Sequence, residues 1–462
     1  MALNEQVRGA SILEDLIGDS PWNAKQKLAL GLICLMLVAD GLDNLTMGVA
    51  TPAVAKDLGV PLSAFGPVFA LGLVGLSIGS LCAGTLGDRL GRKFVLLLSV
   101  FIFGTCTLAS IWVSSVDQLS ALRFCAGLGM GGAVPAATAL IAELTPRRNR
   151  TFAISLGIIA IPVGAVVGSA LAAQILPVLG WRWLFGIAAA FPLVLLPVFA
   201  LLVPESPHFF LNSGRSREKI ARSIALIGLT PPAEELAAPA GSAAAATPKA
   251  ARPNPLALFR AGMGLDTIAL CGAFFSSMSA TYFMLSWLPA ILSTAGLAIG
   301  ASSHAMLVYN SGGIVAGLVS AEFVRRRGSR LLILVGFMGV AFSLLLAFGP
   351  AISTMGDALL LIVLAILGAT ITGLNNPLFA VAANRYPAEI RATGVGTVLF
   401  CGRIGSIITA LAGGWLIALP NGAMVFFVTN AVILAISCVS LAVLRGHIPA
   451  ARRRGDPEPA RT

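Results

Sequence analysis

The chain has 462 residues, of which 57% are hydrophobic and 11% are charged, and its mean hydropathy is +0.90. Because a soluble globular domain carries roughly 25% charged residues, this composition excludes a soluble protein and requires a covering of lipid. The formal net charge of +11 predicts no nucleic-acid partner, since the basic residues form short runs between apolar segments and not one patch on a folded domain.

Membrane-spanning helices are predicted where the sequence stays apolar for roughly 20 residues, the length that crosses a bilayer. Twelve such spans are expected, at residues 27–53, 62–86, 93–114, 118–143, 150–174, 181–203, 265–292, 300–322, 330–349, 357–382, 390–417 and 422–445. The predicted fold class is therefore an all-α membrane protein with two six-helix halves, at 27–203 and 265–445. The linker at 204–264 allows a short helix at 207–227, and its Ala- and Pro-rich part, 230–256, is expected to be disordered.

Lysines and arginines collect on the cytoplasmic side of membrane proteins. Here they gather before the first span, after spans 2, 4, 8 and 10, and after the last span, whereas the opposite loops hold little beyond Lys56 and Arg182. The N-terminal segment 1–26, the linker and the tail 446–462 are therefore predicted to be cytoplasmic, in a multi-pass protein of the inner or plasma membrane.

The first span contains two aspartates near its middle, Asp40 and Asp43. A carboxylate inside a membrane helix is costly unless it has a partner or a function. The spacing of three residues puts both on one helical face, which must look towards protein or water. This face is the candidate proton site.

The loop after the second span reads GTLGDRLGRK. It resembles the G-x-L-x-D-R-x-G-R-K signature of the major facilitator superfamily. Asp88 can pair with Arg92 or with the positive N-terminal end of another helix, and such a pair would be a conformational latch, made in one state and broken in the other. The alternative is a plain cytoplasmic anchor. The latch candidates are Gly84, Asp88, Arg89, Gly91, Arg92 and Lys93.

The two halves end corresponding spans with corresponding residues. Span 4 is followed by Pro146 and Arg150, and span 10 by Pro387 and Arg391, at the same P-x-x-x-R spacing. This correspondence predicts two six-span repeats in parallel orientation.

Arg123 opens a glycine-rich fourth span, in which the glycines let another helix pack closely. The side chain either extends to the membrane surface or forms an ion pair with an aspartate of the first span. Sugar porters of the same superfamily are similar at both places, and this likeness makes Asp43 the partner of Arg123 and Asp40 the additional acid.

The sequence D-G-x-D at 40–43 narrows the resemblance to the aromatic acid/proton symporters, and four segments agree: GWRWLF at 180–185, PESPHFFL at 204–211, SWLPAIL at 286–292 and RATGVGTVLFCGRIG at 391–405. The resemblance implies alternating-access import of a benzoate- or hydroxybenzoate-type carboxylate with protons. It also implies a monomer that is driven by the proton gradient and needs no cofactor.

Arg403 is expected near the middle of the eleventh span, about 18 Å from Arg391 along the helix. Its guanidinium suits a substrate carboxylate, but a permanent salt bridge or bonds to backbone carbonyls are equally open. Aromatic side chains in the spans could stack on the ring of an aromatic substrate, but they also fit core packing. Asparagines are costly in an apolar span, so they favour a role in hydrogen bonding to a substrate. The remaining candidates for substrate binding are Tyr282, Phe283, Trp287, Tyr309, Asn310, Asn375 and Asn376.

Three other functions are weighed. A sugar or polyol porter fits the fourth span and the PESP segment, but the seventh span lacks a glutamine- and asparagine-rich pattern. An efflux antiporter would need a fuller glycine-proline pattern in the fifth span. An enzyme or receptor is disfavoured, because no nucleophile–base set or metal cluster is readable and no large soluble extension is present.

Overall fold

The computed structural model describes residues 11–213, 217–230, 258, 263–349, 352, 356–387 and 390–448, with only the backbone at Ala321 and Ala392. The predicted disordered segment 230–256 lies outside the described residues from 231 onwards, as does the tail from 449. Contacts divide the chain into two units, residues 1–252 with 299–307, and residues 253–298 with 308–462.

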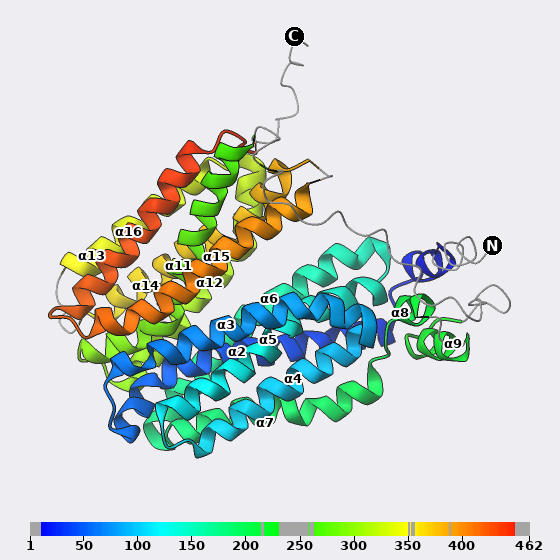
Figure 1. Cartoon of the computed structure of the whole chain (residues 1–462), viewed down its shortest axis with the longest axis horizontal. Helices are drawn as coiled ribbons and strands as arrows, with labels where there is room; N and C mark the ends of the chain where they lie inside the picture. Colours follow the sequence, from blue (N-terminus) through cyan, green and yellow to red (C-terminus); the bar gives the residue numbers. More distant parts are fainter. Residues whose placement is uncertain are drawn as a thin grey trace, which may run out of the picture. The chain divides into compact units, whose positions relative to one another are not determined.

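Twelve long helices lie at the twelve predicted spans within the described ranges (Figure 1). In chain order they are α2 (Ala24–Leu58), α3 (Gly66–Leu90), α4 (Arg92–Ala109), α5 (Val116–Leu144), α6 (Arg147–Val178), α7 (Trp181–Leu202), α11 (Gly264–Thr294), α12 (Ile299–Arg327), α13 (Leu331–Phe348), α14 (Asp357–Arg385), α15 (Arg391–Ile417) and α16 (Gly422–Val443). Short 3₁₀ helices, η1 (Leu62–Phe65) and η2 (Ser110–Trp112), precede α3 and follow α4. The predicted all-α fold is confirmed.

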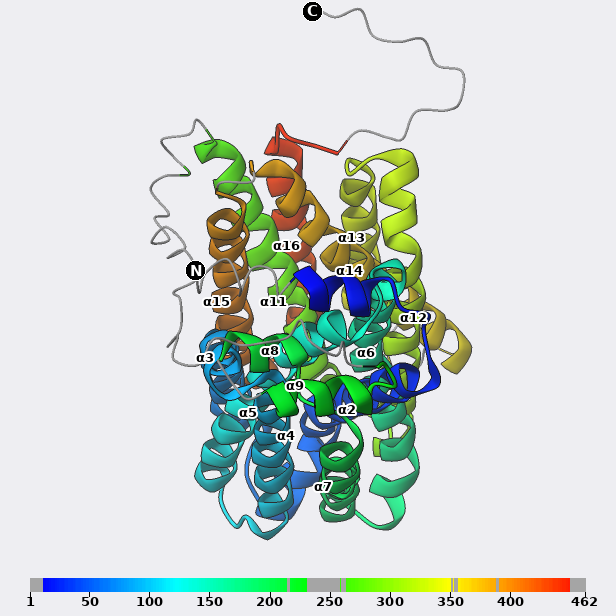
Figure 2. The ribbon, with the colours of Figure 1, turned by 90° about the vertical axis from the view of Figure 1, so that its right-hand side faces the viewer.

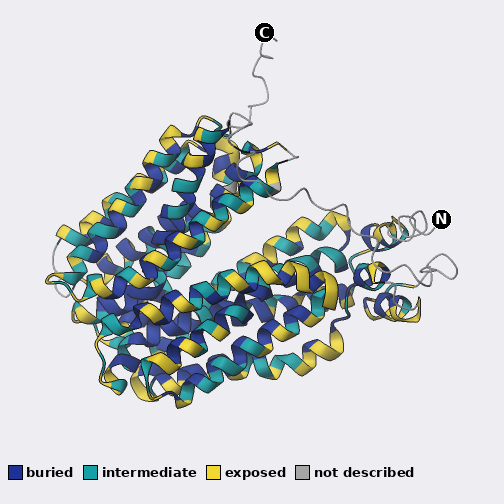
Figure 3. Ribbon diagram, viewed as in Figure 1, coloured by how far each residue is buried: buried dark blue, intermediate teal, exposed yellow. Residues whose placement is uncertain are grey.

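Eleven of the helices are long and apolar enough to cross a membrane. Helix α12, which contains Ala321, is not among the eleven found within the described residues. Large apolar side chains are exposed along the outer faces of both units, where Figure 3 shows the exposed residues in yellow. Such surfaces need lipid around them, so the chain is a multi-pass membrane protein.

Glycines set the distance between helices inside each unit. In the first unit α3 packs on α5, and a Cβ at Gly131 would lie 2.1 Å from the backbone oxygen of Leu76. In the second unit α14 approaches α12 in the same way, and a Cβ at Gly368 would lie 2.0 Å from the backbone oxygen of Tyr309. The same pairing of the second and fourth long helices in each unit is the arrangement that the predicted repeats require.

Three short helices form a small cluster at the end of the first unit. They are a helix at residues 11–18, α8 (Pro207–Asn212) and α9 (Arg217–Leu226), which lie together in Figures 1 and 2. Leu13, Leu211, Ile220 and Ile224 make its buried core. The short helix expected at 207–227 is thus two helices.

We expect Gly131→Ala to destabilise the protein, because the added methyl group meets backbone atoms of α3 that cannot move aside. Overpacking of this kind costs about 1–3 kcal/mol. Gly31→Ala is the matched control, since a Cβ there meets nothing within 4 Å. Thermal unfolding in detergent should give a lower midpoint for Gly131→Ala and an unchanged or higher one for Gly31→Ala. Equal midpoints would contradict the packing argument.

Candidate functional site

A buried ion pair joins α2 to α5 in the first unit. Asp43 is completely buried, and its Oδ2 lies 3.3 Å from Nη1 of Arg123, whose side chain is 4% exposed. Thr107 of α4 donates its hydroxyl to Oδ1 of Asp43 at 2.5 Å. Arg123 also donates from Nη2 to the hydroxyl oxygens of Thr107 and Ser110, each at 3.2 Å. Both carboxylate oxygens of Asp43 therefore have a polar partner from another helix.

Helix α7 closes this network from another side. The guanidinium carbon of Arg123 lies 5.1 Å from the ring centroid of Phe185, within the range of a cation–π contact. Arg123 therefore points into the unit and not to the membrane surface. The network around Asp43 and Arg123 thus joins four helices, α2, α4, α5 and α7.

Asp40 lies about one turn before Asp43 on α2 and is 6% exposed. Gly41 stands between the two acids, and a Cβ there would lie 1.8 Å from the backbone oxygen of Ile161 in α6. The D-G-x-D sequence thus combines two buried acids with a glycine that lets α2 and α6 touch.

Arg403 of α15 faces α11 in the second unit. Its Nη1 donates to the hydroxyl oxygen of Tyr282 at 3.1 Å, and its guanidinium carbon lies 5.9 Å from the centre of that ring. Both side chains are partly exposed. Among the described residues no acid lies within ion-pair distance of Arg403. The guanidinium therefore keeps donors for an anion.

The polar candidates of α12 and α14 differ in exposure. Asn375 is nearly buried, and its Nδ2 lies 3.5 Å from the Thr281 hydroxyl on α11. Asn376 is exposed, Tyr309 is buried, and Asn310 is half-buried. Asn375 thus contacts α11 at Thr281, the residue next to Tyr282.

Phe283 and Trp287 are completely buried between helices of the second unit. The Phe283 ring stacks on Phe426 of α16 with centroids 4.3 Å apart. The indole N–H of Trp287 donates to the backbone oxygen of Ala410 in α15 at 2.9 Å. Both aromatic side chains hold α11 against its neighbours, so we leave them out of the proposed substrate site.

The latch candidates lie where α3 meets α4. Arg92 pairs with Asp88 at 2.9 Å and with Glu143 of α5 at 3.2 Å. Burial lowers the pKa of the nearby His208 in α8. The negative charge of Glu143 raises this pKa, but it offsets the effect of burial only in part. Arg92 is thus the cation that links the ends of α3, α4 and α5, while Arg89 and Gly84 are exposed.

Glu205 caps the N-terminus of α4, a role that the sequence did not suggest. Its carboxylate accepts from the backbone N–H groups of Lys93 at 2.9 Å and Phe94 at 3.2 Å. Gly91 makes room for it, because its φ is +106° and a Cβ there would lie 2.2 Å from the Glu205 carboxylate. The glycine of the signature thus serves both the turn and the cap. Lys93 extends to the backbone oxygen of Ala200 at 2.6 Å.

Asp266, at the start of α11, was also missed. It is 3% exposed, and its Oδ2 accepts from Nε of Arg385 at 2.6 Å. Its Oδ1 accepts from the backbone N–H of Arg445 at 2.8 Å. The available signal was an acid at the edge of one predicted span and an arginine at the end of another. In the part of the chain that is described, no group of three His, Cys, Asp or Glu residues could hold a metal ion.

Comparison with known proteins gives a family match over nearly the whole chain. Residues 32–385 and 269–461 match the family described as Major Facilitator Superfamily. The chain is 31% identical to the 4-hydroxybenzoate transporter of Pseudomonas putida, covering 88% of this chain and 90% of that one. It is 32% identical to the gallate transporter of Pseudomonas putida, covering 96% of each.

Solved structures show the same fold at low identity. The E. coli xylose transporter in a partially occluded inward-open conformation superposes with a TM-score of 0.69 at 14% identity, covering 92% of this chain and 99% of that one. A D-xylose-proton symporter gives a TM-score of 0.68 at 15% identity, covering 91% and 97%. At these identities the likeness concerns the fold alone.

We expect Arg123→Gln to destabilise the protein more than the double variant Asp43→Asn/Arg123→Gln does. Removing one member of a buried pair leaves an uncompensated charge and costs about 3–5 kcal/mol, whereas replacing both avoids that penalty. The measurement is the unfolding midpoint of the purified protein in detergent.

The exposed pair of Asp57 and Arg182, 2.7 Å apart, is the control. Its single and double variants should differ little, because exposed ion pairs contribute about 0–1 kcal/mol. If the double variant at Asp43 and Arg123 has an unfolding midpoint no higher than that of Arg123→Gln, the two residues are not energetically coupled.

Proposed function

Because the chain belongs to the major facilitator superfamily and, within it, to the aromatic-acid transporters, we propose that it imports an aromatic carboxylate together with protons. It is a transporter and not an enzyme. The observation that carries the proposal is the identity of 31–32%, over 88–96% of this chain, to transporters of 4-hydroxybenzoate and gallate. Both compounds are ring carboxylates with hydroxyl groups, so the substrate is of the benzoate or hydroxybenzoate class.

The proton site of this proposal is the face of α2 that carries Asp40 and Asp43. The Asp43–Arg123 contact, with both side chains buried, supports it because a proton on Asp43 would release Arg123 from its counter-ion. Asp40 provides a second buried acid on the same helix, with a role in proton transfer or near the substrate.

The carboxylate site of this proposal is Arg403 with Tyr282. A guanidinium can hold a carboxylate through two parallel hydrogen bonds, and the Tyr282 ring offers a surface on which an aromatic ring can stack. Asn375 is the further hydrogen-bonding group. The lack of an acid within ion-pair distance of Arg403 among the described residues supports this assignment over a permanent salt bridge.

Coupling follows if the outward- and inward-facing states differ in their affinity for both the proton and the carboxylate, since a ligand shifts an equilibrium only through such a difference. The Asp88–Arg92–Glu143 contacts would be kept in one state and broken in the other, as a latch. We place the transporter in the inner or plasma membrane, with both termini cytoplasmic, as a monomer that uses the proton gradient and no cofactor.

A sugar or polyol porter is the second candidate, because the fold is also that of the xylose transporters. Uptake of labelled benzoate, 4-hydroxybenzoate and glucose, with and without a protonophore, separates the two. We expect protonophore-sensitive uptake of an aromatic acid and none of glucose. Glucose uptake alone would reject the proposal, and substrate-induced proton influx distinguishes symport from antiport.

Arg403→Gln should abolish high-affinity uptake, because the carboxylate loses its charged partner. Hydrogen bonds to charged groups contribute about 1.5–3 kcal/mol, so the substrate concentration that gives half-maximal uptake should rise at least tenfold. Arg403→Lys keeps the positive charge but lacks the planar guanidinium. Its half-saturating substrate concentration should lie between those of the wild type and Arg403→Gln. Tyr282→Phe removes one hydrogen bond and should have a smaller effect. An unchanged half-saturating concentration in Arg403→Gln would show that the arginine is structural.

Asp43→Asn should abolish accumulation against a gradient but allow exchange of labelled for unlabelled substrate, because an amide of the same shape cannot take up the proton. Asp40→Asn tests the second acid in the same two assays. Asp57→Asn, an exposed residue, is the control and should keep both activities. Full accumulation in both Asp43→Asn and Asp40→Asn would place the proton site elsewhere.

A further inference from the structure

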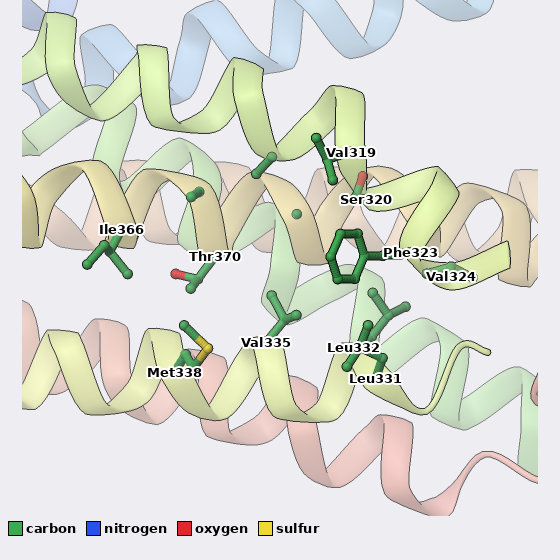
Figure 4. A pocket seen from close by; sticks show the side chains of 13 residues that line it. Val319, Ser320, Phe323, Val324, Leu331, Leu332, Val335, Met338, Ile366 and Thr370 are labelled. Carbon is green, nitrogen blue, oxygen red and sulfur yellow. The ribbon is translucent and has the colours of Figure 1, made fainter. Parts of the chain in front are cut away.

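The second unit contains an apolar groove between α12, α13 and α14, and none of the residues proposed above for substrate or proton binding lines it. Its volume is about 350 Å³. Figure 4 shows Phe323 projecting from α12 into the space above α13, with Val335 and Met338 pointing up from α13 and Ile366 on α14. Phe323 is 50% exposed and Met338 is 49% exposed, so the groove opens at the surface of the unit.

The groove has no polar group left to bind a carboxylate. Its two hydroxyls belong to Ser320 and Thr370. Ser320 donates to the backbone oxygen of Gly317 at 3.1 Å, and Thr370 donates to that of Leu367 at 2.9 Å. Both hydroxyls are thus bonded to their own helices, and the walls can hold only an apolar occupant.

Positive charge lies at one end of this groove. Ala316, Ser320 and Phe323 line it from α12 and recur at helical spacing, so Arg327, four residues further, lies on the same face. Arg330 directly precedes Leu331, which lines the groove from α13. Both arginines are exposed.

Neighbouring arginines are already paired, whereas these two are not. Arg325 and Arg326 both bind Glu322, at 2.6 Å and 2.5 Å. No ion pair joins Arg327 or Arg330 to any residue in the described ranges. The end of the groove therefore carries two cations whose charge is not balanced by a nearby acid.

We propose that this groove binds an anionic phospholipid, with one acyl chain against Phe323, Val335 and Met338 and its phosphate at Arg327 and Arg330. Helices α13 and α14 are membrane-spanning, so the groove opens towards acyl chains. Basic sites between membrane helices bind anionic headgroups, and each basic side chain near the surface adds to the attraction. An apolar trough that ends in unbalanced cations has the charge pattern of such a lipid.

The test compares phosphatidylglycerol with phosphatidylcholine of the same acyl chains, added to the full-length protein in detergent. Thermal unfolding and native mass spectrometry report stabilisation and retained lipid. Phosphatidylglycerol should stabilise the wild type more and be retained at lower concentration. In Arg327→Gln/Arg330→Gln its apparent affinity should fall about 30-fold, while that of phosphatidylcholine, whose choline balances its own phosphate, should fall much less. Arg148→Gln/Lys219→Gln, two exposed cations of the first unit, is the charge-matched control and should behave as the wild type.

A second variant tests the apolar part. Ala369→Phe fills the groove and should remove stabilisation by both lipids, whereas Ala190→Phe at an exposed position of α7 should not. If Ala369→Phe does not fold, the arginine variant decides alone. Equal effects of the two lipids on the wild type would overturn the proposal, as would stabilisation by glycerol 3-phosphate equal to that by the whole lipid.

Discussion

The cost of burying an ionised group shapes both units. A charge in an apolar interior is tolerated only when a partner is held in place, and Asp43 in the first unit and Asp266 in the second both show this constraint. Asp43 gathers α2, α4, α5 and α7 around it through Arg123, Thr107 and Phe185. Asp266 does the same for the ends of α11, α14 and α16 through Arg385 and the backbone of Arg445. These two carboxylates add directional contacts between helices to the apolar packing.

Arg403 is informative by contrast. Its sequence environment is as apolar as that of Arg123, yet its donors meet a phenol and, among described residues, no carboxylate within ion-pair distance. The first unit thus pairs its buried arginine with an acid, whereas Arg403 in the second unit has no acid within ion-pair distance among the described residues, and we propose that a substrate carboxylate balances it.

The sequence was sufficient for the helices, because the length and hydropathy of a span are local properties. For Arg123 it left two alternatives, and the likeness to sugar porters selected Asp43 as the partner that the structure contains. The hydrogen bonds of Thr107 and Ser110 to the ion pair were not predicted. Hydroxyl groups in membrane helices commonly donate to the backbone of their own helix, as those of Thr46 and Thr51 do. The sequence could not say whether Phe283 and Trp287 lie in the core or in a binding site, since both places favour aromatic residues. The hydrogen bond from the backbone N–H of Arg445 to Asp266 could not be predicted, because every residue except proline has such a donor.

The cage around Asp266 has a consequence for how the protein is made. Its carboxylate binds partners 119 and 179 residues later in the chain. During synthesis, α11 is therefore made before the partners of Asp266. The set of hydrogen bonds to this carboxylate is complete only after the last helix has been made. A chain that is cut short before Arg445 lacks this closure, because one oxygen of the Asp266 carboxylate has then lost its backbone donor.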